Sequence, residues 1–161
     1  MDVFTLAEAA TVLEMPKSII RNWTIGRPLK FSPTVKRALG TGTRNLYSRE
    51  DLYLFSLAWH MVEFGLSTTK IQGVLDQFSI IGRDLGGPHA ISWVLLEPNP
   101  KNRKWIFVIL IPQRTPWPNV ASHSKDAINR YFVDFGQIRD EIDTRIGNLP
   151  IEGKRRKRAR K

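Results

Sequence analysis

Residues 38–51, ALGTGTRNLYSRED, combine groups that can hold a phosphate. The GTGT segment brings two glycines and two hydroxyls, and Arg44 can pair with phosphate oxygens. A dinucleotide-binding loop needs a strand that runs straight into its glycines, a helix that leaves them and a third glycine at a set spacing. Here the glycines lie in the bend of a basic hairpin, and the helix signal begins only at Ser48. The stretch therefore predicts phosphate contacts without a nucleotide-binding loop.

Positive charge is concentrated in two parts of the chain. The formal net charge is +10, and the last eight residues, KRRKRARK, carry seven basic side chains and no acidic one. Between Glu14 and Glu50 no acidic residue occurs, whereas the basic residues there are Lys17, Arg21, Arg27, Lys30, Lys36, Arg37, Arg44 and Arg49. Clusters of this kind attract polyanions.

Several classes of chemistry lack their sequence patterns. The chain has no cysteine, and His60, His89 and His123 are scattered without the spacing of metal ligands. It has no His-Glu-x-x-His motif, nucleophile elbow, P-loop lysine or paired acids at a catalytic spacing. We therefore predict no catalytic residue, no metal site and no cofactor, and do not expect an enzyme.

Apolar segments are short. The longest apolar run, Trp105 to Ile111, is far too short to cross a bilayer, and the N-terminus MDVFTLAEAA lacks the features of a secretory signal. We expect a soluble protein without membrane contacts, and the lack of cysteine fits a reducing, cytoplasmic setting.

Residues 5–26 predict two short helices. Thr5 and Glu8 fit a capping box, so the first helix should begin at about Leu6 and end before Pro16. The second should begin near Pro16 and end at Gly26. A pair of helices joined by such a turn is either a helix-turn-helix unit or a helical hairpin of another kind.

Residues 27–47 lose helical periodicity. Leu29–Phe31 and Asn45–Tyr47 are expected to be short strands joined by the basic loop, and a hairpin in this place would be a wing. Ser48 should cap a helix that ends at Gly65, and Ser67 should cap the next one. The apolar stripe of that last helix is Ile71, Val74, Leu75 and Phe78.

Three motifs carry a family resemblance. In order and spacing, FTLAEAATVLEMPKSIIRNW, TRNLYSREDL and FGLSTTKIQGVL resemble the winged helix-turn-helix of MerR-type transcriptional regulators and of the related excisionase-like DNA-binding proteins, over residues 4–78. The resemblance implies a bacterial or phage protein associated with the nucleoid, whose second helix enters the major groove of double-stranded DNA. The recognition residues would then be Lys17, Ser18, Arg21 and Asn22, with Arg21 suited to guanine and Asn22 to adenine.

The remaining basic residues are expected to contact phosphates rather than bases. The wing would use Lys30, Lys36, Arg37, Thr43, Arg44 and Tyr47. A disordered tail would add Lys154, Arg155, Arg156, Lys157 and Arg158, although a nuclear localisation signal or an RNA contact fits the same composition.

The second half predicts a β-hairpin followed by a long amphipathic helix. The hairpin would pair Ile91–Glu97 with Lys104–Pro112, and the helix would extend over about residues 125–146. Its apolar face can mediate a homodimer, as the resemblance implies, or pack on the hairpin of its own chain; the residues proposed for the dimer are Ile128, Tyr131, Phe135, Ile138 and Ile142. The aromatic residues Trp93, Trp105, Phe107 and Trp117 fit either a core or a small-molecule pocket.

Together these patterns predict an α+β chain with three parts. Residues 1–80 would be the winged helix-turn-helix domain, residues 81–149 a dimerisation, effector or partner domain, and residues 150–161 a basic tail. The favoured function is a sequence-specific transcriptional regulator. The alternatives are a recombination directionality or architectural factor, and a protein-interaction adaptor that binds its partner through the apolar hairpin.

Overall fold

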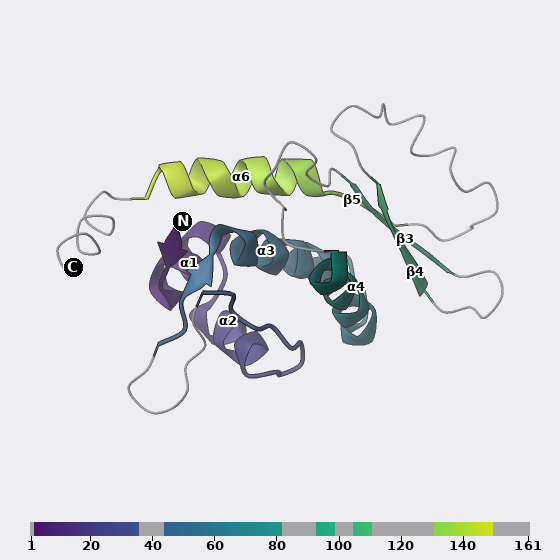
Figure 1. Cartoon of the computed structure of the whole chain (residues 1–161), viewed down its shortest axis with the longest axis horizontal. Helices are drawn as coiled ribbons and strands as arrows, with labels where there is room; N and C mark the ends of the chain where they lie inside the picture. The colour runs from purple at the N-terminus through teal and green to yellow at the C-terminus, as the bar shows by residue number, and fades with distance from the viewer. Residues whose placement is uncertain (1, 36–43, 82–92, 99–104, 111–130, 150–161) are drawn as a thin grey trace.

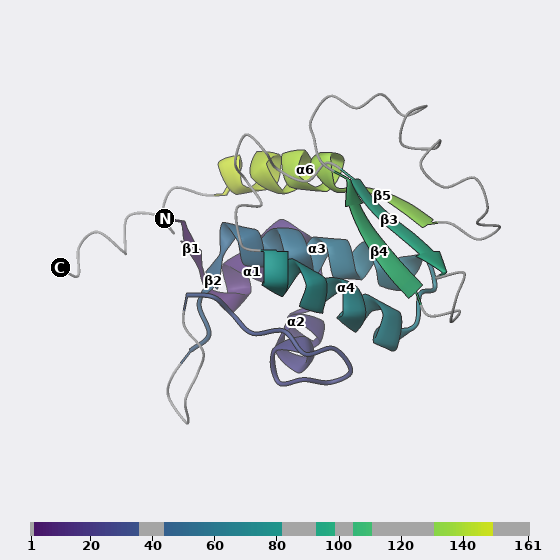
Figure 2. The same cartoon turned by 45° about the vertical axis from the view of Figure 1, so that its right-hand side comes forward.

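The computed structural model describes residues 2–35, 44–81, 93–98, 105–110 and 131–149 (Figure 1). Helix α3 lies in the middle of the molecule, with α2 on one side of it and α6 on the other, in both views (Figures 1 and 2). The elements in chain order are β1 (Val3–Phe4), α1 (Leu6–Leu13), α2 (Lys17–Thr24), β2 (Tyr47–Ser48), α3 (Arg49–Glu63), α4 (Thr68–Ile81), β3 (Trp93–Pro98), β4 (Trp105–Leu110), β5 (Tyr131–Asp134) and α6 (Phe135–Gly147).

The two predicted N-terminal helices are confirmed. The Thr5 hydroxyl accepts from the Glu8 N–H at 3.3 Å, and the Glu8 carboxylate accepts from the Thr5 N–H at 2.7 Å, which completes the capping box of α1. Glu14 follows α1 in the left-handed conformation, with φ of 54°. The chain then turns at once into α2, so α1 and α2 form a helix-turn-helix pair.

Helix α3 begins and ends where the sequence predicts, and α4 begins directly after Ser67, as expected. Ser48 and Asp51 form the capping box of α3, and Gly65 ends the helix with φ of 77°, which glycine adopts without strain. The predicted stripe of α4 is buried in the core along its whole length. Helical spacing and caps were thus sufficient to place these helices.

The predicted pairing of the wing strands is wrong. Tyr47 pairs with Phe4 and Ser48 with Val3 in an antiparallel ribbon, so β2 pairs with β1 and not with residues 29–31. Residues 29–31 form no strand, and their alternating pattern instead places Leu29 and Phe31 in the core. The apolar residues of this segment therefore reflect burial on one side of an extended chain rather than a strand. Residues 36–43, which include Lys36, Arg37 and Thr43, lie outside the described residues.

The C-terminal half contains the predicted hairpin and one strand that was missed. β3 and β4 pair antiparallel, from Trp93 opposite Leu110 to Pro98 opposite Trp105. β5 pairs with the other edge of β3, which gives a sheet of order β4-β3-β5. The expected helix over residues 125–146 is therefore wrong at residues 131–134, and α6 begins only at Phe135. Asp134 caps it by accepting from the Gln137 N–H at 2.8 Å.

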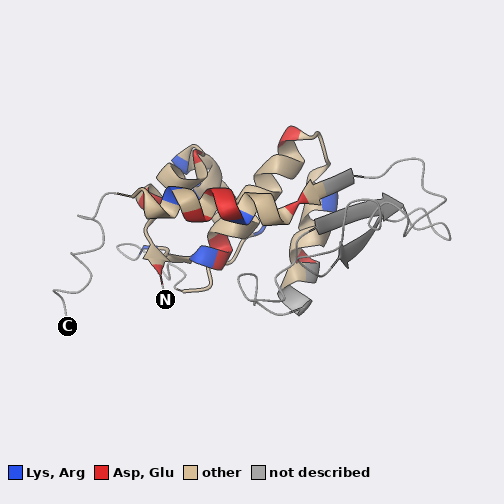
Figure 3. Ribbon diagram, turned by 90° about the horizontal axis from the view of Figure 1, so that it is seen from above, with Lys and Arg blue, Asp and Glu red and all other residues tan. Residues whose placement is uncertain are grey.

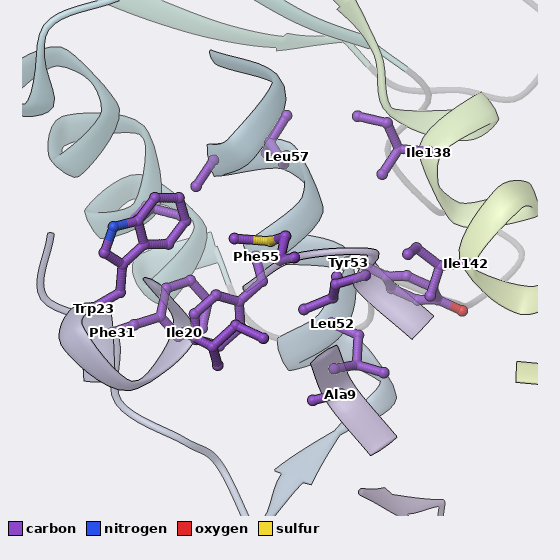
Figure 4. Packing of buried hydrophobic residues seen from close by; sticks show 14 of the residues in the cluster. Ala9, Ile20, Trp23, Phe31, Leu52, Tyr53, Phe55, Leu57, Ile138 and Ile142 are labelled. Carbon is purple, nitrogen blue, oxygen red and sulfur yellow. The ribbon is translucent and has the colours of Figure 1, made fainter. Parts of the chain in front are cut away.

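The apolar face of α6 packs on helices of its own chain. Phe135, Ile138 and Ile142 are buried in the same cluster as residues of α1, α3 and α4, and Tyr53 of α3 meets Phe135 edge to face. Figure 4 shows Ile138 and Ile142 of α6 on the side of α3 where Tyr53 lies. Two arrangements were predicted for this face, a homodimer and packing on the hairpin of the same chain. In the structure the face packs within the chain, and its contacts include α3 as well as the hairpin. The predicted domain boundary at residue 80 stays a prediction, while the buried core includes residues on both sides of it.

Candidate nucleic-acid interface

Helix α2 has one buried and one exposed face. Ile20, Trp23 and Thr24 are buried. All four predicted recognition residues, Lys17, Ser18, Arg21 and Asn22, are exposed, and their spacing places them on one face of the helix. The structure therefore brings the four residues together on a surface that a large ligand can reach.

An aromatic cluster holds α2 against the rest of the molecule. Phe55 of α3 is its centre: the Trp23 ring lies parallel to it at 6.0 Å between centroids, and the Phe31 ring stacks on it at 3.9 Å. Tyr47 meets Phe55 edge to face at 5.8 Å, and Trp59 tilts against Trp23 at 6.2 Å. Trp23 is thus a core residue, and its burial fixes the orientation of the exposed face of α2.

Backbone hydrogen bonds define the end of α2. The Gly26 N–H donates to the Trp23 carbonyl at 3.1 Å, and the Arg27 N–H donates to the Asn22 carbonyl at 2.9 Å. Gly26 has φ of 86°, so the end is a Schellman motif that requires glycine. Arg27 follows Gly26 and is exposed, although it was not among the predicted DNA-binding residues. The sequence could have indicated this residue, because Arg27 lies between Glu14 and Glu50, where basic residues occur without any acidic one.

The structure contradicts a phosphate contact by Tyr47. Its side chain is 0% exposed, and its hydroxyl lies 3.2 Å from the Thr24 Oγ1 at the end of α2. Burial raises the pKa of the Tyr47 hydroxyl above its ordinary value, against the opposing effect of hydrogen bonds with Thr24 and Asn45. The Tyr47 ring packs on Phe55 in the core, and its hydroxyl contacts Thr24 of α2 within the core. The hydroxyl therefore does not face a ligand.

Asp51 joins Thr34 to Ser48, two described residues that lie on either side of residues 36–43 in the sequence. One carboxylate oxygen, Oδ2, accepts from the N–H and the hydroxyl of Thr34, both at 2.9 Å, and from the Ser48 N–H at 2.9 Å. The Thr34 hydroxyl also contacts the Ser48 Oγ at 2.8 Å. Asp51 is 1% exposed, and a buried carboxylate with several donors is a strong structural link. It fixes the positions of Thr34 and Ser48 relative to each other.

Two further predicted phosphate contacts, Lys30 and Arg44, are exposed. Lys30 belongs to the segment that follows α2, and this segment lies on the side of the molecule away from α6 (Figures 1 and 2). The basic tail, Lys154 to Arg158, is outside the described residues, as is Ile128. The structure thus places part of the predicted phosphate-binding set on the α2 side.

Charge is unevenly distributed between the two sides. Seen from the α6 side, acidic residues follow one another along that helix and its cap (Figure 3). They are Asp134, Asp140, Glu141 and Asp143, against Arg139 and Arg145. The α2 side has Lys17, Arg21, Arg27 and Lys30 exposed, in a stretch without acids. The exposed basic residues of α2 and of the segment after it therefore favour a polyanion on that side.

Polar contacts tie α6 to α1 and α3. The Tyr53 hydroxyl donates to the Asp143 Oδ1 at 2.6 Å, and the Arg49 Nη1 lies 3.3 Å from the same oxygen. Arg145 pairs with Glu14 at 3.1 Å, in the turn between α1 and α2. The C-terminal helix is thus part of the scaffold that holds the helix-turn-helix pair.

The described part of the chain has neither a metal-binding cluster nor a membrane-crossing helix. No group of three or more histidine, aspartate or glutamate residues there is arranged to hold a metal ion. No helix in those ranges combines the length and apolarity that a membrane crossing requires.

Comparison with known proteins identifies the N-terminal part. Residues 4–77 match the family described as MerR HTH family regulatory protein. The match covers β1 to α4, which includes α2 with its exposed residues and the segments on either side of residues 36–43. No curated protein matches the chain.

Proposed function

Because residues 4–77 are a MerR-type helix-turn-helix segment, we propose that the protein is a sequence-specific, double-stranded DNA-binding transcriptional regulator. Helix α2 enters the major groove in this proposal. Arg21 and Asn22 read base edges, and Lys17 and Ser18 contact the neighbouring backbone or bases.

The division of α2 into two faces is the observation that carries the proposal. A recognition helix needs one face fixed in the core and one face free to enter the groove. Trp23 and Ile20 supply the first, and the exposed set of Lys17, Ser18, Arg21 and Asn22 supplies the second. The exposed face ends in a rigid Schellman motif, so the side chains that meet DNA start from a fixed backbone.

Phosphate contacts provide affinity and register in the same proposal. Arg27, Lys30 and Arg44 are exposed for this role, and Lys36, Arg37, Thr43 and the basic tail are assigned to it by sequence. A homodimer also stays a proposal. Its interface would have to leave Phe135, Ile138 and Ile142 in the core of their own chain, where they are buried.

Selection of bound duplexes from a random pool, followed by footprinting, tests the function. We expect a preferred sequence, and we expect Arg21→Ala to relax the preference at one base pair, at a cost of about 1–3 kcal/mol. Arg44→Ala serves as the comparison, because Arg44 is exposed and assigned to a phosphate, and loss of a phosphate contact should weaken binding to all sequences alike. Wild-type protein that enriches no sequence beyond the effect of charge would refute the proposal.

A further inference from the structure

Gln72 of α4 makes paired hydrogen bonds with the backbone of Lys30. The Lys30 N–H donates to the Gln72 Oε1 at 2.8 Å, and the Gln72 Nε2 donates to the Lys30 carbonyl at 3.3 Å. The two residues are 42 positions apart in the sequence. A side-chain amide thus binds both backbone groups of one residue, as a neighbouring strand would.

The Gln72 amide is itself oriented by a charged acceptor. Its Nε2 also donates to the Asp76 Oδ1 at 2.9 Å, one turn further along α4. A carboxylate accepts but cannot donate, so it selects the nitrogen end of the amide and turns the oxygen toward the Lys30 N–H. The adjacent residue Ile71 is buried, which anchors this part of α4 to the core.

The segment that Gln72 holds is anchored on both sides of Lys30. Leu29 and Phe31 are buried, and the Phe31 N–H donates to the Trp23 carbonyl in α2 at 2.9 Å. The Lys30 side chain is exposed between these anchors. The backbone around Lys30 is therefore held by one hydrogen bond from Phe31 to α2 and by two hydrogen bonds between Lys30 and α4.

We propose that Gln72 is a positioning residue for DNA binding, which fixes the Lys30 ammonium so that it contacts a backbone phosphate beside the base contacts of α2. The inference rests on the proposed function. A flexible lysine loses conformational freedom when it binds a phosphate, and a backbone fixed beforehand lowers that cost. The hydrogen bonds of Gln72 are exposed to solvent. They therefore add little to folding stability, and their effect should be seen in binding.

The experiment measures the affinity of the full chain for a mixed-sequence duplex about two helical turns long, over a range of salt concentrations. Gln72→Ala should weaken binding by about two- to tenfold. Lys30→Met, which keeps a long side chain but removes the charge, should weaken binding and lower the steepness of the log–log salt dependence by about one. In the Lys30→Met background, Gln72→Ala should have little further effect.

The matched control is Gln137→Ala. Gln137 lies on α6, away from α2, and its Nε2 donates to the Glu141 Oε1 at 2.9 Å, the same type of bond one turn along a helix. The control should bind duplex as the wild type does. Urea unfolding of every variant separates a loss of binding from a loss of folded protein.

Three results would overturn the inference: equal effects of Gln72→Ala and Gln137→Ala, an undiminished effect of Gln72→Ala in the Lys30→Met background, or a loss of binding that follows a loss of stability. The proposed function fails separately. If selection yields no preferred sequence while the coupling between Gln72 and Lys30 is found on the mixed-sequence duplex, the positioning role stands and the sequence-specific regulator does not.

Discussion

Tyr53 is a buried phenol whose hydroxyl has a charged acceptor. It donates to the Asp143 Oδ1 at 2.6 Å, and this bond joins α3 to α6. Burial, then the hydrogen bond to Asp143 and its negative charge, raise the pKa of Tyr53 well above its ordinary value of 10.0, against the smaller effect of Arg49. The folded state therefore keeps the proton that the unfolded state releases at about pH 10.

Tyr53→Phe should change the alkaline stability of the protein. Because the pKa is raised in the folded state, the contribution of Tyr53 is complete below its unfolded pKa of 10.0 and is lost as the pH rises above it. At neutral pH the variant should lose about 1–2 kcal/mol with the hydrogen bond. Above pH 10.0 its free energy of unfolding should fall less steeply with pH than that of the wild type.

Urea unfolding at several pH values measures both quantities. Some pH dependence should remain in the variant, because burial also raises the pKa of Tyr47. Parallel curves for wild type and Tyr53→Phe between neutral and alkaline pH would show that the Tyr53 proton is not linked to folding.

At the same scale, sequence reasoning gave the wrong location for Tyr47, which is buried, and the right one for Arg21, which is exposed. A tyrosine in a basic stretch fits both a phosphate contact and a core, and only the pairing of β2 with β1, beside the aromatic cluster, placed it inside. Arg21 belongs to a helix whose apolar positions already define the buried face. Its exposure follows from helical spacing alone.

At the scale of elements, α6 completes the core of the helix-turn-helix part. Ile142 is 0% exposed and belongs to the same cluster as Ala9 of α1 and Leu52 of α3 (Figure 4). Arg145 adds a contact with the Val12 carbonyl at 3.4 Å, near the end of α1. Loss of α6 packing should therefore destabilise α1 and α3, which lie far earlier in the sequence.

Ile142→Ala should lower the free energy of unfolding by about 2–5 kcal/mol, because it removes buried methylene groups and leaves a cavity. Thr144→Ala, at an exposed position of the same helix, should change it by no more than about 0.5 kcal/mol. Hydrogen exchange adds the spatial readout: amides of α1 and α3 should lose protection together with those of α6. Protection lost in α6 alone would show that the N-terminal helices are stable without it.

The elements also show where periodicity misleads. Apolar residues three or four positions apart continue from the strand β5 into α6, and this spacing predicted one helix across both. The start of α6 is instead set by the Asp134 cap, and β5 is set by a free edge of β3. Strand pairing depends on a partner that is distant in sequence, so the local pattern could not reveal it.

At the scale of the whole molecule, the charge distribution orients the protein. Exposed basic residues lie on the α2 side, and acidic residues predominate along α6 (Figure 3). A polyanion should approach the α2 side and be repelled by the opposite one. The seven basic residues that end the chain add a sequence-independent attraction.

Salt dependence of DNA binding tests this arrangement. If about six phosphates are neutralised by one copy of the chain, the log–log slope of affinity against salt should be on the order of minus five. A chain that ends at Leu149, without the basic tail, should bind more weakly with a shallower slope and keep the same sequence preference. A slope near about minus two for the intact chain would exclude the wing and the tail as phosphate contacts.

The sequence by itself determined the helices α1 to α4, the N-caps of α1 and α3, the β3–β4 hairpin and the exposed face of α2, because these depend on residues that are close along the chain. It also contains the basic block, from which a polyanionic partner is predicted. Only the tertiary structure decided that β2 pairs with β1, that α6 packs on α3, and that Gln72 holds Lys30. Each of these joins residues far apart in sequence, and such contacts depend on how the whole core packs.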